Sequence, residues 1–600
     1  MTNPEDLLEA AQPELELLAE QNEDLTGVDR RAFLFMSLAA AAASTLAPAV
    51  SRAQAGAAAG AAAAPQQAPV PPYPLGNGEP PAEQFMPYPG GTGALMEDMV
   101  RKHGAKAFQR STFNVAKWSG AVPASDDDIA FMPAHRLSAM LKARKITSTR
   151  LTNIYLTRLK RLNPTLNCAV TIMEASALAE AAKMDAEIAA GKYRGPLHGL
   201  PYGVKDLFDT KGVRTTWGSK DFENRISESD AEVVVRLRDA GAVLIAKLST
   251  GIFAQNDQWF GGRTNNPWNL TQGSSGSSAG PSSATAGGCV AFGIGTETQG
   301  SIVSPAIRCG LSALRPTFGR VSRAGGMVLA WTQDRVGPIC RTIEDCAMVF
   351  NVIHGMDRND PSTVTTPFTF DPNIKLSSLR VGVDGEAPKE LVEKLRSLGM
   401  KTKDVGPRPT VPGISDGAGG LNTEYASAFD DYVQRKAKEI GLDLNTLVAP
   451  ATRGAAFPGA GGETGVPADA MAPANWNPRF VGGRLIRGYE YLNQQRRRYV
   501  LVQKWGEYMK DLDLFIASPN RDVAPNAQTG HPCAVVPYKF DVPQQFQGGR
   551  GGAATPPPPP LNPQPICGVI TGNLYNDDII LSVAHQFQVH DDTVNKHPSL

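Results

Sequence analysis

Apolar residues recur at helical spacing in the first half of the chain. The five that outline one helix face are Leu151, Ile154, Tyr155, Leu159 and Leu162. Residues three or four positions apart lie on the same side of an α-helix, so this spacing predicts a helix with one buried face. We expect Thr147 or Ser148 to cap its start and Pro164 to end it. A second helix is expected over residues 174–190, ended by Gly191.

Short apolar runs between such helices predict the strands of a layered domain. Leu200–Val204 leads into Lys205, and Val243–Ala246 is a second apolar run. Between them, Asp230 is expected to cap a helix that continues through Ala240. Helices that alternate with short apolar strands are typical of an α/β fold. The pattern returns late in the chain, where we expect a helix and then a strand: residues 505–512 and 514–517.

The N-terminal segment resembles a twin-arginine export signal. Arg30 and Arg31 precede an apolar, alanine-rich run from Phe33 to about Val50, and Ala53-Gln54-Ala55 then gives a cleavage pattern. We expect the twin-arginine export machinery to deliver the folded protein to the periplasm or the medium, with no stable membrane insertion after processing. A permanent N-terminal membrane anchor is the alternative. A plain cytoplasmic helix is disfavoured because the apolar residues form no one-sided stripe.

Composition divides the chain into three parts. Residues 1–55 form the expected signal. Residues 56–124 begin as an Ala-, Pro-, Gln- and Gly-rich linker, which has too little bulky apolar surface to offset its ordering entropy, and continue as a segment that we expect to be loosely ordered from residue 82. Residues 125–600 form the main domain. Within it, residues 548–565 contain five consecutive prolines and predict a surface insertion with extended polyproline character.

Charge and cysteine content exclude some classes of function. The chain has 59 basic and 59 acidic residues, so it has no general attraction to nucleic acid. The first 55 residues carry nine acidic and three basic side chains, which leaves a mild charge of +6 on the rest. The seven cysteines are scattered, without a CxxC pair or a histidine at ligand spacing, so we expect no zinc site and mostly buried thiols. The three histidines that could indicate another mechanism are expected to be structural: His198, His531 and His585.

Two segments carry candidate chemistry. Residues 271–301 are rich in Gly and Ser, as a flexible linker would be, but the apolar stretches Ala291–Ile294 and Leu311–Leu314 enclose the end of the segment. Glycines between core elements usually let the backbone approach a ligand closely, which favours an active-site loop. Lys205 ends a predicted strand. Such a lysine is usually solvated, but a buried lysine has a lowered pKa and can act as a base.

These segments resemble the amidase signature family over about residues 126–355, and again near the C-terminus at 512–519 and 574–587. The resemblance rests on several motifs in the family's order: Pro196–Leu207, Ser229–Lys247, Asn266-Pro267-Trp268-Asn269, Gly295–Ser301, Cys309-Gly310, Leu314–Thr317, Gly319–Ser322, Val336-Gly337-Pro338 and Arg341-Thr342. The resemblance implies an α/β fold with a large mixed β-sheet core covered by helices on both faces. It also implies hydrolysis of a small-molecule amide without a metal or organic cofactor.

The resemblance further implies a catalytic triad. In the family, the relay serine lies nine residues after the Trp of Asn-Pro-Trp and twenty-four before the nucleophile. Both spacings select Ser277 rather than Ser274. Ser301 is then the nucleophile, Ser277 the proton relay and Lys205 the base. The family places a cis peptide before the relay serine. Its oxyanion hole would be formed by four backbone N–H groups: Thr298, Gln299, Gly300 and Ser301.

Two departures from the family pattern bear on the substrate pocket. Gln299 replaces a glycine, and would be strained if that glycine has a positive φ. Val303 replaces an arginine, whose charge Arg308 could supply. Two other functions therefore stay open: a catalytically inactive binding protein, and the glutamine amidase component of an amidotransferase. The nature of the amide and the presence of a homodimer also stay open.

Overall fold

The computed structural model describes Asn77 and residues 86–414, 420–439, 441, 443–446, 478–519, 526–543 and 561–600. The expected export signal and the linker up to residue 76 lie outside the described residues, as do positions 548–560 of the expected insertion. Among the described residues, no helix is long and apolar enough to cross a membrane.

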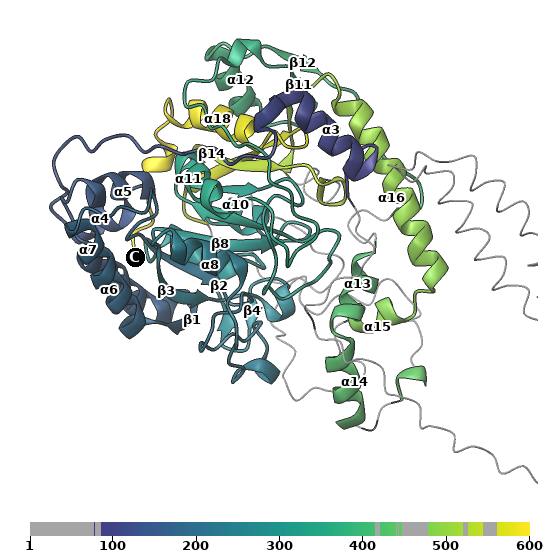
Figure 1. Cartoon of the computed structure of the whole chain (residues 1–600), viewed down its shortest axis with the longest axis horizontal. Helices are drawn as coiled ribbons and strands as arrows, with labels where there is room; N and C mark the ends of the chain where they lie inside the picture. Colours follow the sequence, from purple (N-terminus) through teal and green to yellow (C-terminus); the bar gives the residue numbers. More distant parts are fainter. Residues whose placement is uncertain are drawn as a thin grey trace, which may run out of the picture. The chain divides into compact units, whose positions relative to one another are not determined.

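An eleven-stranded sheet forms the centre of the domain (Figure 1). The strands, in their order across the sheet, are β1 (Ala169–Ile172), β3 (Val243–Leu248), β2 (Pro201–Lys205), β8 (Phe292–Glu297), β10 (Arg335–Cys340), β9 (Ser312–Arg315), β14 (Cys533–Asp541), β15 (Gln564–Gly572), β13 (Leu514–Ala517), β11 (Val381–Val383) and β12 (Thr402–Asp404). Strand β2 runs parallel to β3 and β8, and β11 runs parallel to β12 and β13. The other pairs are antiparallel, so the expected mixed sheet is confirmed.

Helices cover both faces of this sheet. Ala313 and Val535 belong to an apolar cluster that includes Ala306 of α10 (Val303–Arg308). Their neighbours Leu314, in β9, and Ala534, in β14, belong to another apolar cluster. That cluster includes residues of α11 (Ile343–Ile353) and α18 (Asp577–Gln588). Because successive strand residues alternate between faces, the two clusters lie on opposite sides of the sheet.

The remaining helices flank these layers. They are α3 (Gly91–His103), α4 (Asp126–Phe131), α5 (Ala134–Lys142), α6 (Ser148–Leu166), α7 (Glu174–Ala189), α8 (Glu232–Asp239), α9 (Ala279–Ala286), α12 (Lys389–Ser397), α13 (Leu421–Ala428), α14 (Asp430–Glu439), α15 (Pro478–Arg484) and α16 (Gly488–Met509). Two short hairpins lie apart from the main sheet: β4 (Gln258–Trp259) with β5 (Gly262–Arg263), and β6 (Asn265–Asn266) with β7 (Asn269–Gly273).

Helix α6 begins as expected but ends later. The Thr147 hydroxyl accepts a hydrogen bond from the Arg150 N–H at 3.1 Å, which confirms the N-cap. Pro164 does not end the helix. It lies inside the last turn, and the chain leaves the helix at Asn167, whose φ is +50°. Asparagine tolerates this left-handed conformation and therefore ends the helix here. Gly191, with φ of +81°, follows α7 as expected.

Asp230 does not cap α8, contrary to the prediction. The residue before the helix is Ala231, and no side chain caps it. The Asp230 carboxylate instead accepts a hydrogen bond from the Lys211 N–H at 2.8 Å and pairs with Arg238 at 2.5 Å. Because the Asp230 carboxylate bonds these partners, it does not accept a hydrogen bond from an N–H group in the first turn of α8.

The segment before residue 125 is more regular than expected. Residues 91–103, in the part predicted to be loosely ordered, form α3. Its Leu95 and Met99 are buried in a cluster with Tyr575, close to the start of α18. The apolar residues of this short helix complete a small satellite core, which explains its order.

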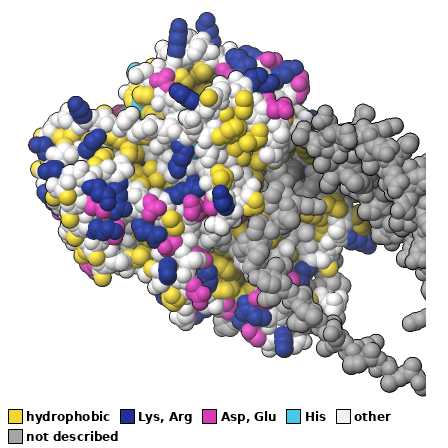
Figure 2. Space-filling view, viewed as in Figure 1, with side chains coloured by type: hydrophobic (Ala, Val, Ile, Leu, Met, Phe, Trp, Pro, Cys, Tyr) yellow, Lys and Arg dark blue, Asp and Glu magenta, His cyan; other side chains and the backbone are white. Residues whose placement is uncertain are grey.

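Charges of both signs are interspersed on the face of the described domain in Figure 2, where dark blue and magenta side chains alternate. This distribution agrees with the mild net charge of the main domain.

Candidate active site

Lys205 lies at the end of β2, between β3 and β8 in the sheet, and is fully buried. Burial removes the ammonium group from water, and this lowers the pKa of Lys205 well below its ordinary value of 10.5. Asp334 and Glu297 oppose the shift through their negative charges, but burial has the larger effect. Burial therefore favours the neutral amine of Lys205 over its ammonium form.

Two hydroxyl groups hold the Lys205 amine. Its Nζ donates to Ser277 Oγ at 2.8 Å and to Thr296 Oγ1 at 2.9 Å. The peptide bond between Gly276 and Ser277 is cis, as the family resemblance implied. The Ser274 hydroxyl instead donates to the Ser275 carbonyl at 3.0 Å. The structure thus brings Lys205 to Ser277 and not to Ser274.

The serine loop is fastened to the end of β8. The Ser278 N–H donates to the Ser301 carbonyl at 3.0 Å, and the Ser278 hydroxyl bonds both the carbonyl and the N–H of Thr296, at 3.0 and 3.2 Å. Glycine makes this approach possible, because a Cβ on Gly295 would lie 2.6 Å from Ser278 Oγ. Ser301 is half-buried, whereas Ser277 is buried.

A buried carboxylate closes the turn that carries Ser301. Glu297 accepts hydrogen bonds from the N–H groups of Ile302 and Val303 at 2.7 and 2.8 Å, and from Arg315 Nη1 at 2.9 Å. The intervening residues therefore form a compact turn. Within this turn Gly300 has a φ of +118°, a backbone conformation that glycine adopts readily.

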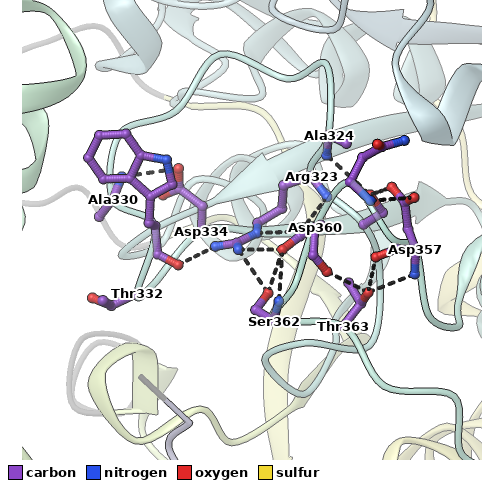
Figure 3. Close-up of polar contacts among 12 residues, drawn as sticks. Arg323, Ala324, Ala330, Thr332, Asp334, Asp357, Asp360, Ser362 and Thr363 are labelled. Carbon is purple, nitrogen blue, oxygen red and sulfur yellow. Dashed lines mark hydrogen bonds and ion pairs between the residues drawn. The ribbon is translucent and has the colours of Figure 1, made fainter. Parts of the chain in front are cut away.

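Gln299 does not have a positive φ, so the strain considered for it is absent. Its side chain turns away and donates to Gln333 Oε1 at 3.0 Å. The neighbouring Thr298 hydroxyl donates to Asp334 Oδ1 at 2.7 Å. Asp334 is itself held by the Leu329 and Ala330 N–H groups at 2.8 and 3.1 Å, and Figure 3 shows Asp334 beside Ala330. A second loop thus supports the turn from outside.

The outer support leaves backbone donors available. Within the described residues, no group accepts a hydrogen bond from the N–H of Gln299, Gly300 or Ser301. Consecutive free N–H groups in a tight turn can bind an oxygen that carries negative charge.

Three residues of this site were not singled out as site residues from the sequence: Thr296, Glu297 and Gln333. Glu297 had one usable signal, because an acid that directly extends an apolar strand must be neutralised or paired when the strand is buried. Thr296 and Gln333 carried no such signal. Their roles depend on which loops meet.

Residues around the site have structural partners. Asp206 is buried and accepts from the Thr216 N–H at 3.0 Å, with Lys247 Nζ at 3.7 Å, so it acts as a structural acceptor. Val303, the first residue of α10, is buried in the apolar cluster that also contains Ala306. Arg308 donates to the Gly273 carbonyl at 3.4 Å, at the start of the serine loop.

The three histidines also have structural environments. His198 Nε2 lies 3.0 Å from the Met184 carbonyl, and His531 Nδ1 lies 2.8 Å from Thr529 Oγ1. Burial lowers the pKa of His531 to about 3 and the pKa of His585 to about 4. The described residues include no cluster of three or more His, Cys, Asp or Glu that could bind a metal ion.

Comparison with known proteins places these features in context. The sequence profile of the amidase family matches residues 150–435. A glutamyl-tRNA(Gln) amidotransferase subunit from Nitrosospira multiformis is 32% identical, over 77% of this chain and 98% of its own length. The native peptide amidase from Stenotrophomonas maltophilia has a TM-score of 0.61 and 25% identity, with 78% of this chain and 98% of that chain covered. An amidase family protein from Bacillus anthracis str. Ames has a TM-score of 0.63 and 23% identity, with 79% and 93% covered.

Proposed function

Because this chain belongs to the amidase family, we propose that it is a serine amidohydrolase, with Ser301 as nucleophile, Ser277 as proton relay and Lys205 as base. The observation that carries the proposal is the buried hydrogen bond of 2.8 Å between Lys205 Nζ and Ser277 Oγ, beside the turn that holds Ser301. A neutral amine in that position can accept a proton through the Ser277 hydroxyl.

In the proposed reaction, Ser301 Oγ attacks the carbonyl carbon of the amide while its proton passes to Ser277, and the Ser277 proton passes to Lys205. The negative charge on the carbonyl oxygen is stabilised by the backbone N–H groups of residues 298–301. The C–N bond then breaks, and the relay returns one proton to the leaving amine. Water attacks the acyl-enzyme by the same relay, which releases the carboxylic acid and restores Ser301.

Ser301→Ala tests the proposal directly. We expect it to abolish hydrolysis in a panel of amides of varied acyl length and amine type, with an unchanged thermal melt. Ser304→Ala is the matched control, because Ser304 lies one helical turn further on and is exposed. A fluorophosphonate probe should label wild type and Ser304→Ala, but not Ser301→Ala, in intact-protein mass spectrometry. Equal activity of Ser301→Ala and wild type would reject the assignment, and an unlabelled wild type would favour an inactive binding protein.

A glutamine amidase role is the second candidate, because a relative covered over almost its whole length is part of an amidotransferase. Ammonia release from glutamine by the purified chain separates the two. An amidohydrolase should cleave panel amides without any partner. An amidotransferase component should prefer glutamine and depend on partner proteins.

We also propose export through the twin-arginine machinery, on the strength of Arg30, Arg31 and the Ala53–Ala55 cleavage pattern. Replacing both arginines by lysine should leave unprocessed precursor in the cytoplasm. Export of that double variant at the wild-type level would contradict the proposal.

A further inference from the structure

The loop before β10, residues 329–334, meets the turn of residues 298–301 because of the strand pairing below them. In the antiparallel ladder of β8 and β10, Glu297 at the end of β8 lies opposite Arg335 at the start of β10. The chain that follows β8 and the chain that precedes β10 therefore leave the sheet at the same end. The first of these is the turn that carries the proposed oxyanion donors, and the second is the loop.

Two side-chain hydrogen bonds join the loop to this turn. Thr298 Oγ1 donates to Asp334 Oδ1 at 2.7 Å, and Gln299 Nε2 donates to Gln333 Oε1 at 3.0 Å. Thr298 and Gln299 also carry two of the backbone N–H groups proposed to stabilise the carbonyl oxygen. A shift of the loop would therefore move these donors, and a misplacement of about 1 Å can cost on the order of 10²-fold in rate.

The loop is also closed on itself. The N–H groups of Gln333 and Asp334 donate to the Ala330 carbonyl at 3.0 and 2.9 Å. The Asp334 carboxylate accepts in turn from the N–H groups of Leu329 and Ala330 at 2.8 and 3.1 Å. These bonds fix the residues of the loop relative to one another, so an anchor at one residue also holds the others.

Two buried charged side chains anchor the loop at Thr332. From α13, Glu424 Oε2 accepts from the Thr332 N–H at 3.0 Å, and Glu424 Oε1 accepts from the Thr332 hydroxyl at 2.7 Å. From α16, Arg498 donates to the same hydroxyl at 2.6 Å and to the Thr332 carbonyl at 2.7 Å. All three residues are buried. Each polar group of Thr332 therefore bonds a charged side chain, and such hydrogen bonds are stronger than those between neutral groups.

The two anchoring side chains carry opposite charges. Burial lowers the pKa of Arg498 to about 10, and the negative charge of Glu424 opposes this shift, so the guanidinium stays protonated at neutral pH. Buried opposite charges contribute little net stability, because both lose their hydration. They do fix a geometry here, since both side chains are hydrogen-bonded to one threonine hydroxyl.

A further anchor lies one residue before Thr332. Arg323 donates to the Trp331 carbonyl and is itself held by the Asp360 carboxylate at 2.8 Å. Figure 3 shows Arg323 directed at Asp360 and Ser362, with Thr332 and Asp334 in the loop beside it. The outer side of the loop is thus bonded at two successive residues, and its inner side is bonded to the turn.

We propose that Thr332, Glu424 and Arg498 are positioning residues for amide hydrolysis: the two charged side chains hold Thr332, and thereby hold the loop against the turn with the oxyanion donors. This inference rests on the proposed amidohydrolase function. The three residues act through the loop and the turn rather than by contact with the reacting atoms. Truncation of Arg498 would leave the buried Glu424 carboxylate without its cation, so the test is made at Thr332, where no charge changes.

Thr332→Val replaces the hydroxyl by a methyl group of similar size. With a panel amide that wild type cleaves, it should lower kcat by about 10- to 100-fold and leave KM within about twofold, because the transition state depends most on the oxyanion donors. Thr332→Ser keeps the hydroxyl and should recover most of the wild-type kcat. Thr149→Val is the matched control and should keep wild-type kinetics, because the Thr149 hydroxyl donates to the Asp185 carboxylate at 2.7 Å between α6 and α7.

The double variant of Thr298→Val and Thr332→Val tests the route of the effect. If Thr332 acts through the turn, the loss of kcat in the double variant should be close to that of the more impaired single variant. Losses that multiply, an unchanged kcat in Thr332→Val, or equal losses in Thr332→Val and Thr149→Val would each overturn the inference while wild-type hydrolysis stands. If wild type cleaves no amide in the panel, the amidohydrolase function is rejected, and this inference is rejected with it.

Discussion

The buried amine of Lys205 should give this protein a measurable pH dependence of stability, which Lys205→Met should remove. In the folded chain burial lowers the pKa of Lys205 well below 10.5, whereas the unfolded chain exposes the amine to water. Between the folded and unfolded pKa values, only the unfolded state binds the proton. The contribution of the neutral Lys205 amine to the free energy of unfolding is therefore complete above the unfolded pKa, and it is lost as pH falls toward the folded pKa.

The expected size of this effect follows from one proton. In that interval the free energy of unfolding of wild type should rise by about 1.36 kcal/mol per pH unit more than that of Lys205→Met. Over two pH units within that interval, the difference between the two proteins should therefore change by about 2.7 kcal/mol. Urea unfolding at several pH values measures it, and other titrating groups cancel in the comparison.

Lys211→Met is the control, because Lys211 is exposed to solvent. It should follow the wild-type pH dependence. If Lys205→Met also follows wild type, Lys205 is protonated in the folded protein and cannot be the resting base. The same titration should govern catalysis, so activity should rise with pH and be highest from neutral to alkaline conditions. A rate that is highest at about pH 5 and falls by about pH 8, with the fold intact, would rule out neutral Lys205 as the base.

Two further predictions concern the serine loop and the turn. Ser277→Ala should lower kcat on the order of 10³-fold or more, because it interrupts the relay. Ser274→Ala should have a mild effect, because the Ser274 hydroxyl bonds the Ser275 carbonyl. Steady-state kinetics measure both, and an inactive Ser274→Ala would show that the wrong serine has been chosen as the relay. Thr298→Val removes a hydrogen bond to the Asp334 carboxylate worth about 1.5–3 kcal/mol. It should lower kcat with little change in KM, and a change in KM alone would indicate that the turn does not contact the reacting oxygen.

Local periodicity predicted elements whose pattern is complete within a few residues. The strand at Leu514–Ala517 has the predicted bounds, and the helix expected over 174–190 is α7. Helix ends were less predictable, as Pro164 and Asp230 show. A cap is decided by which hydrogen-bond partner a side chain finds, and Asp230 finds Lys211 and Arg238. Helix α16 begins at Gly488, well before the predicted start at Trp505. The prediction missed its first turns because Tyr489 and Leu492 are exposed there, so these turns lack a clear apolar face.

The sequence by itself determined which residues could carry the chemistry. Motif order selected Lys205, Ser277 and Ser301, and the apolar strand before Lys205 indicated that it could be buried. Only the tertiary structure decided their environment. Strands β2 and β8 pair in parallel although five other strands lie between them along the chain, and this pairing brings Thr296 to the Lys205 amine. Burial, pKa and hydrogen-bond partners depend on such long-range neighbours, because they are properties of a site in space rather than of a segment of chain.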